Sequence, residues 1–153
     1  ISNWRRHAPN TIPWDSKAAG LYMICTLSKH EAERQGYSES LMLDHEGNVA
    51  ESTSANIFFK DSNGELHTPI PDCFLDGITR RTVIDIAKSK NIKVHERKIS
   101  PNELPNFVGC FLTGTAAEIT PVSKIAENNY KVCDLIIDLS SSYGKLVRKK
   151  KAA

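Results

Sequence analysis

The sequence lacks a long hydrophobic run, a signal peptide and an excess of charge of either sign. Apolar runs such as Leu21 to Cys25 fall far short of the roughly 18 residues that a membrane span needs. The 20 basic and 18 acidic residues leave a net charge of +2, too small to indicate nucleic acid as a partner. No Asn-x-Ser/Thr site occurs either. We therefore expect a soluble, cytoplasmic domain, with no membrane or nucleic-acid partner, that is an enzyme or part of one.

The sequence also lacks paired cysteines. Its four cysteines lie tens of residues apart among apolar neighbours, and none forms a Cys-x-x-Cys pair. This spacing argues against structural zinc and against a disulfide framework, so we expect no metal and reduced thiols in a cytosolic core. The four are Cys25, Cys73, Cys110 and Cys133.

Neither an initiator methionine nor an internal repeat is present, and the chain begins directly at Ile1. We interpret residues 1–153 as one domain of a longer protein. With 40% hydrophobic and 25% charged residues, a chain of this length can bury roughly 70% of its unfolded surface around one core. No aromatic residue interrupts the basic end from Lys145 to Lys151, which favours a solvated terminus over a nucleic-acid site.

Local signals predict a mixed fold in which helices alternate with mostly antiparallel strands. A first helix is expected from a cap at Asp15 or Ser16 to about Gln35, where Gly36 provides a stop. Two more helices should cover residues 77–90 and 135–151. Strands are expected over residues 40–43, 57–59, 65–68, 92–98 and 107–112.

Two of these helices carry more detailed signals. The helix over residues 77–90 should bury a stripe formed by Ile78, Val83, Ile84 and Ala87. The segment Ser100-Pro-Asn-Glu103 fits a capping box with proline in the first helical position, so a short helix should follow it.

Lys17 lies just after the expected start of the first helix and is followed by Ala18, Ala19 and Gly20. An amine acts as a nucleophile near neutral pH only when its ammonium form is disfavoured, and the positive end of a helix dipole has that effect. The small residues leave room beside it for a flat, bulky ligand. Taken alone, a lysine in such a position is most simply a surface residue.

Glu51 begins a segment of small polar residues that ends at Asn56. This carboxylate either belongs to a surface turn or is a buried acid whose surrounding backbone is fixed by Asn56.

Two other segments could bind anions through backbone amides. Gly77 precedes the second helix, so the amides of Ile78 and Thr79 form either an ordinary helix start or an anion site, with the Thr79 hydroxyl beside it. The amides of Thr115 and Ala116 follow a buried strand and could form a second anion-binding nest.

The order and spacing of these segments resemble the signature of class-IV pyridoxal-phosphate aminotransferases. The matching run is Glu51-x-Thr53-x-x-Asn56-Ile57-Phe58, then Leu66-His-Thr68, then Leu75-Asp-Gly77-Ile78-Thr79-Arg80. The segments Trp4-Arg-Arg-His-Ala-Pro-Asn-Thr-Ile-Pro13 and Lys17-Ala-Ala-Gly-Leu-Tyr22 resemble the active-site lysine region of branched-chain amino-acid aminotransferases. The run from Gly114 to Val122 is similar to their cofactor and carboxylate loop, so the resemblance covers residues 1 to about 125.

The resemblance implies that Lys17 forms a Schiff base with pyridoxal 5′-phosphate and moves a proton during catalysis. It places Glu51 at the pyridine nitrogen, where a carboxylate keeps that nitrogen protonated, and gives Asn56 the role of bracing the Glu51 loop. The other implied cofactor contacts are Tyr22 at the phenolic oxygen, Leu75 at the ring face, and the Ile78 and Thr79 amides with the Thr115 hydroxyl at the phosphate. The amides of Thr115 and Ala116 would also lie near the substrate carboxylate.

The resemblance further implies an α+β pseudo-barrel, the large cofactor-binding domain of the D-amino-acid aminotransferase-like fold (fold type IV). Family members also have a smaller N-terminal domain, which supplies an arginine to the phosphate and most of the side-chain pocket; residues 1–153 contain nothing that corresponds to it. The implied activity is transamination between branched-chain L-amino acids (leucine, isoleucine and valine) and 2-oxoglutarate, in a homodimer or larger assembly. D-amino-acid aminotransferases and aminodeoxychorismate lyases share the Glu51 signature, but Gly20 and Tyr22 favour the branched-chain enzymes. A catalytically silent module remains an alternative.

Overall fold

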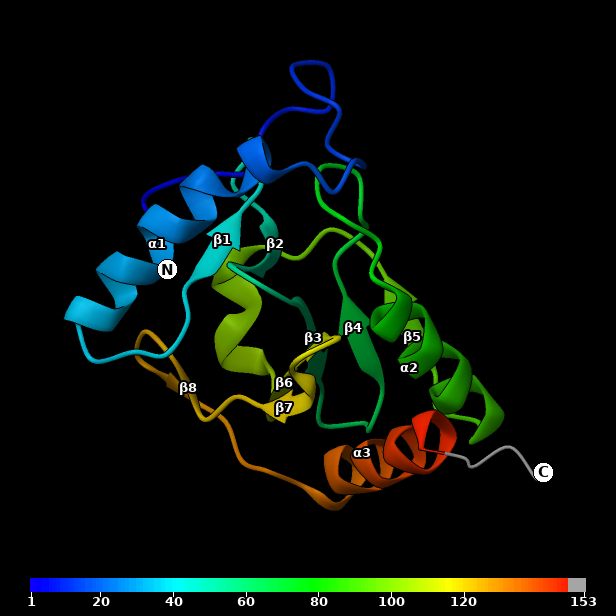
Figure 1. Ribbon diagram of the computed structural model, residues 1–153. Coiled ribbons are helices and arrows are strands. Elements are labelled where there is room, and N and C mark those ends of the chain that lie inside the picture. Colours follow the sequence, from blue (N-terminus) through cyan, green and yellow to red (C-terminus); the bar gives the residue numbers. More distant parts are fainter. Residues whose placement is uncertain (149–153) are drawn as a thin grey trace.

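A five-stranded sheet forms the centre of the molecule (Figure 1). The computed structural model describes residues 1–148. The strands lie in the order β5 (Val94–Glu96), β4 (Leu66–Thr68), β3 (Asn56–Lys60), β6 (Gly109–Gly114) and β7 (Glu118–Pro121). All neighbours are antiparallel except β4 and β5, which are parallel. The expected mixed and mostly antiparallel architecture is therefore confirmed.

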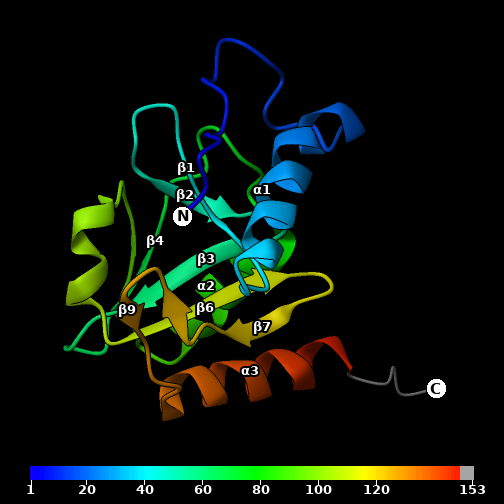
Figure 2. The ribbon, with the colours of Figure 1, turned by 90° about the vertical axis from the view of Figure 1, so that its left-hand side faces the viewer.

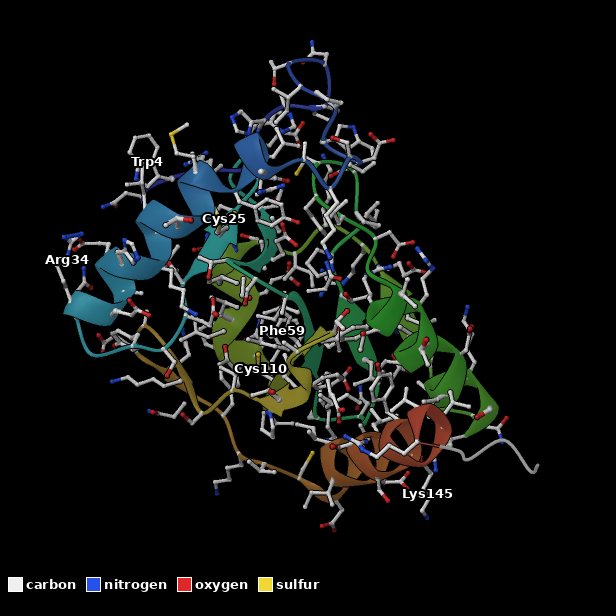
Figure 3. The ribbon with its side chains drawn as sticks, viewed as in Figure 1. Trp4, Cys25, Arg34, Phe59, Cys110 and Lys145 are labelled. Atoms are coloured by element: carbon white, nitrogen blue, oxygen red, sulfur yellow. The ribbon has the colours of Figure 1, made fainter. Side chains whose placement is uncertain are left out.

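Burial on both faces explains the uninterrupted apolar segment in β3. Because successive side chains of a strand point to opposite faces, Phe58 and Phe59 enter different cores. Phe58 stacks on Phe111 with ring centroids 5.0 Å apart, and Phe59 stacks on Phe107 with ring centroids 4.8 Å apart. Phe59 pairs with Cys110 across β3 and β6, and both lie in the interior (Figure 3).

Two helices cover one face of this sheet. Helices α2 (Ile78–Ser89) and α3 (Asp134–Val147) contribute Val83, Ile84, Ile136 and Leu139 to the core around Phe58. Figure 2 shows α3 lying along that face. The opposite core is closed by η2 (Pro101–Asn106) and by the small hairpin of β8 (Lys124–Ile125) and β9 (Asn128–Asn129), with Leu104, Ile125 and Tyr130 packed into it.

A β-hairpin, a helix and the N-terminal segment form a second group of elements beside the central sheet. The strands β1 (Leu41–Leu43) and β2 (Val49–Ser52) form an antiparallel hairpin, and the chain runs on from β2 into β3. Helix α1 (Met23–Arg34) runs alongside β1 (Figure 1). Residues 1–6 follow the same hairpin, with the Arg6 amide donating to the Leu43 carbonyl at 2.8 Å.

The first helix begins later than its sequence suggests. It starts with a single 3₁₀ segment, η1 (Ala19–Tyr22), and becomes α-helical only at Met23. Neither start has a side-chain cap, because Ala18 and Tyr22 occupy the N-cap positions; the Ser16 hydroxyl instead donates to the Pro13 carbonyl and closes a turn there. The expected cap at Asp15 or Ser16 is wrong, but the stop at Gly36 is confirmed by its φ of +83°.

The expected buried stripe of α2 is wrong at one position. Ile78 is 76% exposed, whereas Val83, Ile84 and Ala87 are buried as expected. Nine residues separate Ile78 from Ala87, and at about 100° per residue this places the two on roughly opposite sides of the helix. Thr79 and Arg80 occupy the buried side in its place.

Other boundaries shift by a few residues. Within the described chain, α3 ends at Val147 and β5 covers only the middle of residues 92–98. The capping box at Ser100 and Glu103 is present and starts the 3₁₀ segment η2. In the expected basic terminus, Arg148 is paired with Glu118, whereas Lys149, Lys150 and Lys151 lie outside the described residues.

Three of the four cysteines lie in the core, as the sequence predicts. Cys25, Cys73 and Cys110 are buried free cysteines, which confirms their core placement, and Cys133 is half-buried. Between residues 1 and 148, no helix combines the length and hydropathy that a bilayer crossing demands.

Candidate active site

Glu51 is a buried acid with one cationic neighbour. It lies on β2 with its side chain 13% exposed, and its Oε1 is 3.4 Å from Nε of Arg6. Arg6 is only 5% exposed and is anchored by its backbone to the β1 strand and by a hydrogen bond from Nη1 to Cys25 Sγ at 3.2 Å. The ion pair lacks hydrogen-bond geometry, because Nε of Arg6 has no hydrogen-bond partner among residues 1–148.

Burial is the largest influence on the pKa of Glu51. Loss of hydration raises its pKa to about 8, against the smaller lowering effect of the Arg6 charge. A carboxyl in this position becomes a stable anion near neutral pH when a second positive group is brought to it.

Asn56 connects Glu51 to the segment before α2. Its Nδ2 donates to the Leu75 carbonyl at 2.9 Å and lies 3.4 Å from Glu51 Oε2, and its Oδ1 accepts from the Gly77 amide at 3.2 Å. A Cβ added at Gly77 would lie 2.4 Å from Asn56 Oδ1, so this position needs glycine for steric reasons. The expected bracing by Asn56 is therefore confirmed as a set of contacts.

The first turn of α2 leaves its backbone amides available. Gly77 is the N-cap residue and no side chain caps the helix, so the amides of Ile78 and Thr79 have no intrahelical acceptor. The Thr79 hydroxyl lies 3.3 Å from the Tyr143 hydroxyl, so it faces α3. Any anion at this helix start would meet amides, not the hydroxyl that the sequence suggested as part of the site.

Arg80 holds the start of α2 in place. Its side chain is 1% exposed, and it contacts Asp76 Oδ1 and Glu96 Oε2, each at 2.8 Å, and the Pro69 carbonyl at 3.0 Å. These contacts tie the segment from Leu75 to Gly77 to the edge of the central sheet. The buried Arg80 guanidinium therefore fixes where the amides of Ile78 and Thr79 lie.

The third group of predicted residues lies in the turn between β6 and β7. Thr115 and Ala116 are exposed there. A Cβ added at Gly114 would lie 3.4 Å from the Ala55 side chain and 3.7 Å from the Ser54 carbonyl, so this turn packs against the residues that follow β2. Thr113 pairs with Asn56 across β6 and β3, and its buried hydroxyl has no hydrogen-bond partner within residues 1–148.

The turn after Glu51 has its own support from Glu39. The hydroxyls of Thr53 and Ser54 both donate to the Glu39 carboxylate, the second at 2.9 Å, and Lys29 pairs with the same carboxylate at 3.0 Å. This arrangement fixes a turn made of small polar residues.

Tyr22 and Lys17 lie on the segment that leads into α1. The pKa of Tyr22 is raised by burial first and then by the nearby charge of Glu51, so its phenol belongs to the same neighbourhood as the acid. Lys17 is exposed and lies in extended chain before η1, outside any helix. Its ammonium makes no hydrogen bond or ion pair within the described chain, and the helical segment begins two residues later, at Ala19.

The structure thus brings together Glu51, Tyr22, the Leu75 segment and the α2 amides, but it gives Lys17 no direct contact with them. Arg6, Cys25 and Glu39 are residues that the sequence did not single out. Arg5 and Arg6 are adjacent and chemically identical, so nothing in the sequence distinguishes the buried one from the exposed one.

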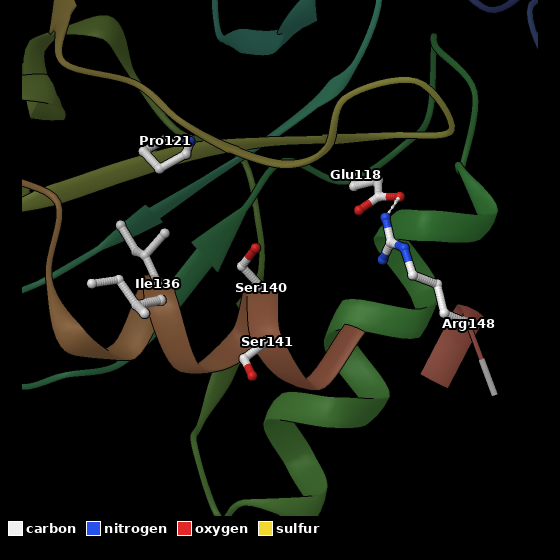
Figure 4. Close-up of a pocket in the computed structure, with 7 residues that line it drawn as sticks. Glu118, Pro121, Ile136, Ser140, Ser141 and Arg148 are labelled. Atoms are coloured by element: carbon white, nitrogen blue, oxygen red, sulfur yellow. Dashed lines mark hydrogen bonds and ion pairs between the residues drawn. The ribbon is translucent and has the colours of Figure 1, made fainter. Parts of the chain in front are cut away.

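A groove in the surface lies elsewhere. A groove of about 410 Å³ runs between β7 and α3, with Pro121 and Ile136 at one end and the Glu118–Arg148 ion pair at the other (Figure 4). None of the predicted site residues lines it. The buried acid and the free helix amides define the candidate site better than this shallow groove.

Comparison with known proteins agrees with the resemblance of the motifs. The family model described as amino-transferase class IV matches residues 1–125. A probable branched-chain-amino-acid aminotransferase of Rickettsia bellii is 43% identical over 155 residues, covering 97% of this chain and 52% of the relative. The branched-chain-amino-acid aminotransferase of Escherichia coli is 42% identical over 126 residues, covering 82% of this chain and 40% of the relative.

Solved structures show the same relationship in the fold. The branched-chain aminotransferase of Thermoproteus uzoniensis with norvaline superposes with a TM-score of 0.93 at 36% identity, covering 99% of this chain and 51% of that one. The branched-chain aminotransferase of Thermobaculum terrenum in its PLP form has a TM-score of 0.90 at 34% identity, covering 95% and 49%. The expected mixed fold of type IV is confirmed, and the chain spans about half the length of these relatives. The chain belongs to the class-IV aminotransferase family.

Proposed function

We propose that this chain is the cofactor-binding part of a branched-chain amino-acid aminotransferase. The reaction would exchange an amino group between leucine, isoleucine or valine and 2-oxoglutarate. The observation that carries the proposal is the buried Glu51 carboxyl, held by Arg6 and Asn56 next to uncapped helix amides. Relatives named as branched-chain aminotransferases, and structures of such enzymes with norvaline and with 4-methylvaleric acid, support this substrate class.

The residues present suit pyridoxal phosphate. Glu51 is an acid whose pKa of about 8 shows that one arginine does not compensate its burial, and a pyridinium nitrogen would supply the missing positive charge. The α2 amides suit a phosphate dianion, and the Leu75 segment, fixed by Asn56, suits a ring face. When bound, the cofactor supplies an electron sink that acidifies the substrate Cα–H bond.

The residues of this chain would hold that group at several points. Lys17 would hold the aldehyde carbon, Tyr22 the phenolic oxygen and Glu51 the ring nitrogen. The phosphate would lie on the Ile78 and Thr79 amides with help from the Thr115 hydroxyl. The substrate carboxylate would lie on the amides of Thr115 and Ala116.

Lys17 would carry the proton in the reaction. Its amine would take the proton from the substrate Cα and deliver it to the C4′ position, while the cofactor would supply the electron sink. This requires a neutral amine, and Lys17 is exposed in residues 1–148. We infer that another part of the complete protein covers it and excludes water.

That missing part would also complete the phosphate site. The α2 amides supply no full positive charge, and a charge-assisted contact to phosphate is about twice as strong as a neutral one. We propose that the remaining half of a complete enzyme, its smaller N-terminal domain, contributes an arginine and the side-chain pocket, and that the whole protein forms a homodimer or larger assembly.

The direct test is titration of a complete protein, with the other half present, with pyridoxal phosphate while the absorbance band of the Schiff base is recorded. We expect wild type and Lys88→Ala, which changes an exposed lysine on α2, to give the same band. Lys17→Ala should lose the band while keeping the same circular dichroism. A band that persists unchanged in Lys17→Ala would contradict the role of this lysine.

A further inference from the structure

Two histidines and a glutamate meet on one face of the β4–β5 pair. His67 and His95 are direct partners in the parallel register, and Glu65 precedes His67 by two residues, which places it on the same face. One ligand atom from each of the three lies within 4.8 Å of the other two. Glu65 Oε2 is already 2.6 Å from His95 Nε2.

The hydrogen bonds around His67 determine which nitrogen can take a new partner. Arg97 Nε donates to His67 Nδ1 at 3.1 Å, so the ring proton is assigned to Nε2, which lies 3.3 Å from Asp61 Oδ2. Asp61 is itself fixed by the amides of Asn63 and Glu65. A carboxylate that orients a histidine through one nitrogen leaves the other nitrogen as a metal ligand in many zinc sites.

The charges nearby permit a divalent cation. Arg97 is paired by both of its terminal nitrogens with Glu103, at 3.1 and 2.7 Å, so its charge is compensated without His67. Lys93 is exposed, and its ammonium is 3.4 Å from Glu65. The two imidazoles are therefore surrounded by more negative than positive groups. The carboxylates are those of Asp61, Glu65 and Glu103, and the cations are Lys93 and Arg97.

We propose that Glu65, His67 and His95 form a site for one zinc ion, with Asp61 orienting His67. The metal would take His67 Nδ1 from Arg97, which keeps its pairing with Glu103, and would enter between Glu65 and His95. Zinc ligands at about 2.1 Å place neighbouring donor atoms roughly 3.4 Å apart. The two imidazole rings are stacked, with centroids 4.7 Å apart and planes at 13°, so one ring must turn out of the stack for both nitrogens to point at one ion. Two imidazoles and a carboxylate are a donor set that zinc favours. The four cysteines gave no reason to expect a metal; the pairing of β4 with β5 creates this site.

The bound ion would stabilise the edge of the central sheet formed by β4 and β5. β5 is a three-residue edge strand, and the ligands come from both strands of the β4–β5 pair. A metal bound only by the folded arrangement stabilises it by mass action. The site shares no residue with the proposed cofactor site.

The test is calorimetric titration of the purified protein with zinc chloride under a phosphine reductant, in a Cys133→Ser background that removes the one partly exposed thiol. We expect one ion per chain and a rise in melting temperature. His67→Ala and His95→Ala should each weaken binding about tenfold or more, whereas His30→Ala, an exposed histidine of α1, should not. Arg97→Gln should bind zinc more tightly, because it removes the competitor at Nδ1.

A second measurement needs no substitution at the ligands. Copper(II) added at one equivalent should give an electron paramagnetic resonance spectrum with hyperfine coupling from two imidazole nitrogens. Zinc binding that is unchanged in both histidine variants, no binding at one equivalent, or a copper spectrum without two nitrogens would each overturn the proposal.

Discussion

Glu51 beside Arg6 shows how a buried acid with one cationic neighbour can prepare a site for a cationic ring. The folded protein raises the pKa of Glu51 to about 8, above its ordinary value of 4.5, so below pH 8 the ligand-free protein holds this acid protonated. A raised folded-state pKa contributes stability that is complete below the unfolded pKa and is lost as the pH rises through the folded one.

The pH dependence of stability follows from that shift. Between about pH 4.5 and pH 8 the ligand-free protein should lose stability through Glu51, by no more than roughly 1.4 kcal/mol per pKa unit. Glu51→Gln cannot ionise, so its stability relative to wild type should increase across this interval, by about 2 kcal/mol or more. Urea unfolding of both proteins at a series of pH values measures the difference. Parallel curves for the two proteins would mean that Glu51 is ionised throughout.

Arg6 should matter to cofactor binding although it would not touch the cofactor. Arg6→Leu removes the one cation beside Glu51, raises the pKa of this acid further and should weaken pyridoxal phosphate binding about tenfold. The matched control is Arg5→Leu, because Arg5 is exposed and its side chain makes a single hydrogen bond within residues 1–148, to the His45 carbonyl at 3.5 Å. Equal affinities of the two variants, from fluorescence titration, would show that Arg6 has no positioning role.

At the scale of elements, the start of α2 depends on a close fit between Gly77 and Asn56. Gly77→Ala places a methyl group 2.4 Å from Asn56 Oδ1, although the backbone there, with φ −60°, accepts alanine. We expect a loss of about 1–3 kcal/mol in the free energy of unfolding, and weaker cofactor binding because the α2 amides move. Gly20→Ala meets nothing within 4 Å and is the steric control in denaturant unfolding. A Gly77→Ala protein as stable as Gly20→Ala would contradict the fit.

The same elements show what a sequence can predict. The hairpin of β3 and β4, the capping box at Ser100 and the helix after Gly77 depend on local signals, and all three are present. The strand β2, which carries Glu51 and pairs with β1, is not among the expected strands. The start of α1 is not predicted correctly, because Ser16 uses its hydroxyl for a turn with the Pro13 carbonyl and does not cap the helix. The burial of Arg6 and the His67–His95 pairing come from contacts between distant segments, which periodicity does not report.

At the scale of the whole molecule, the chain covers about half the length of its relatives, and its predicted lysine is exposed. We expect a polypeptide limited to residues 1–153 to bind pyridoxal phosphate poorly and to show little or no transamination of leucine. A complete protein that includes the other half should show both. Turnover by the 153-residue polypeptide equal to that of a complete enzyme, measured by production of glutamate, would refute this division of labour.

The most direct measurement of the central claim is reduction of the pyridoxal phosphate complex with borohydride, followed by peptide mapping in a mass spectrometer. Reduction converts the Schiff base into a permanent bond and marks the lysine that formed it. We predict a phosphopyridoxyl group on Lys17 alone, and none when Glu51→Gln has weakened the site at the same cofactor concentration. A label on another lysine, or one spread over several surface lysines, would contradict the proposed active site.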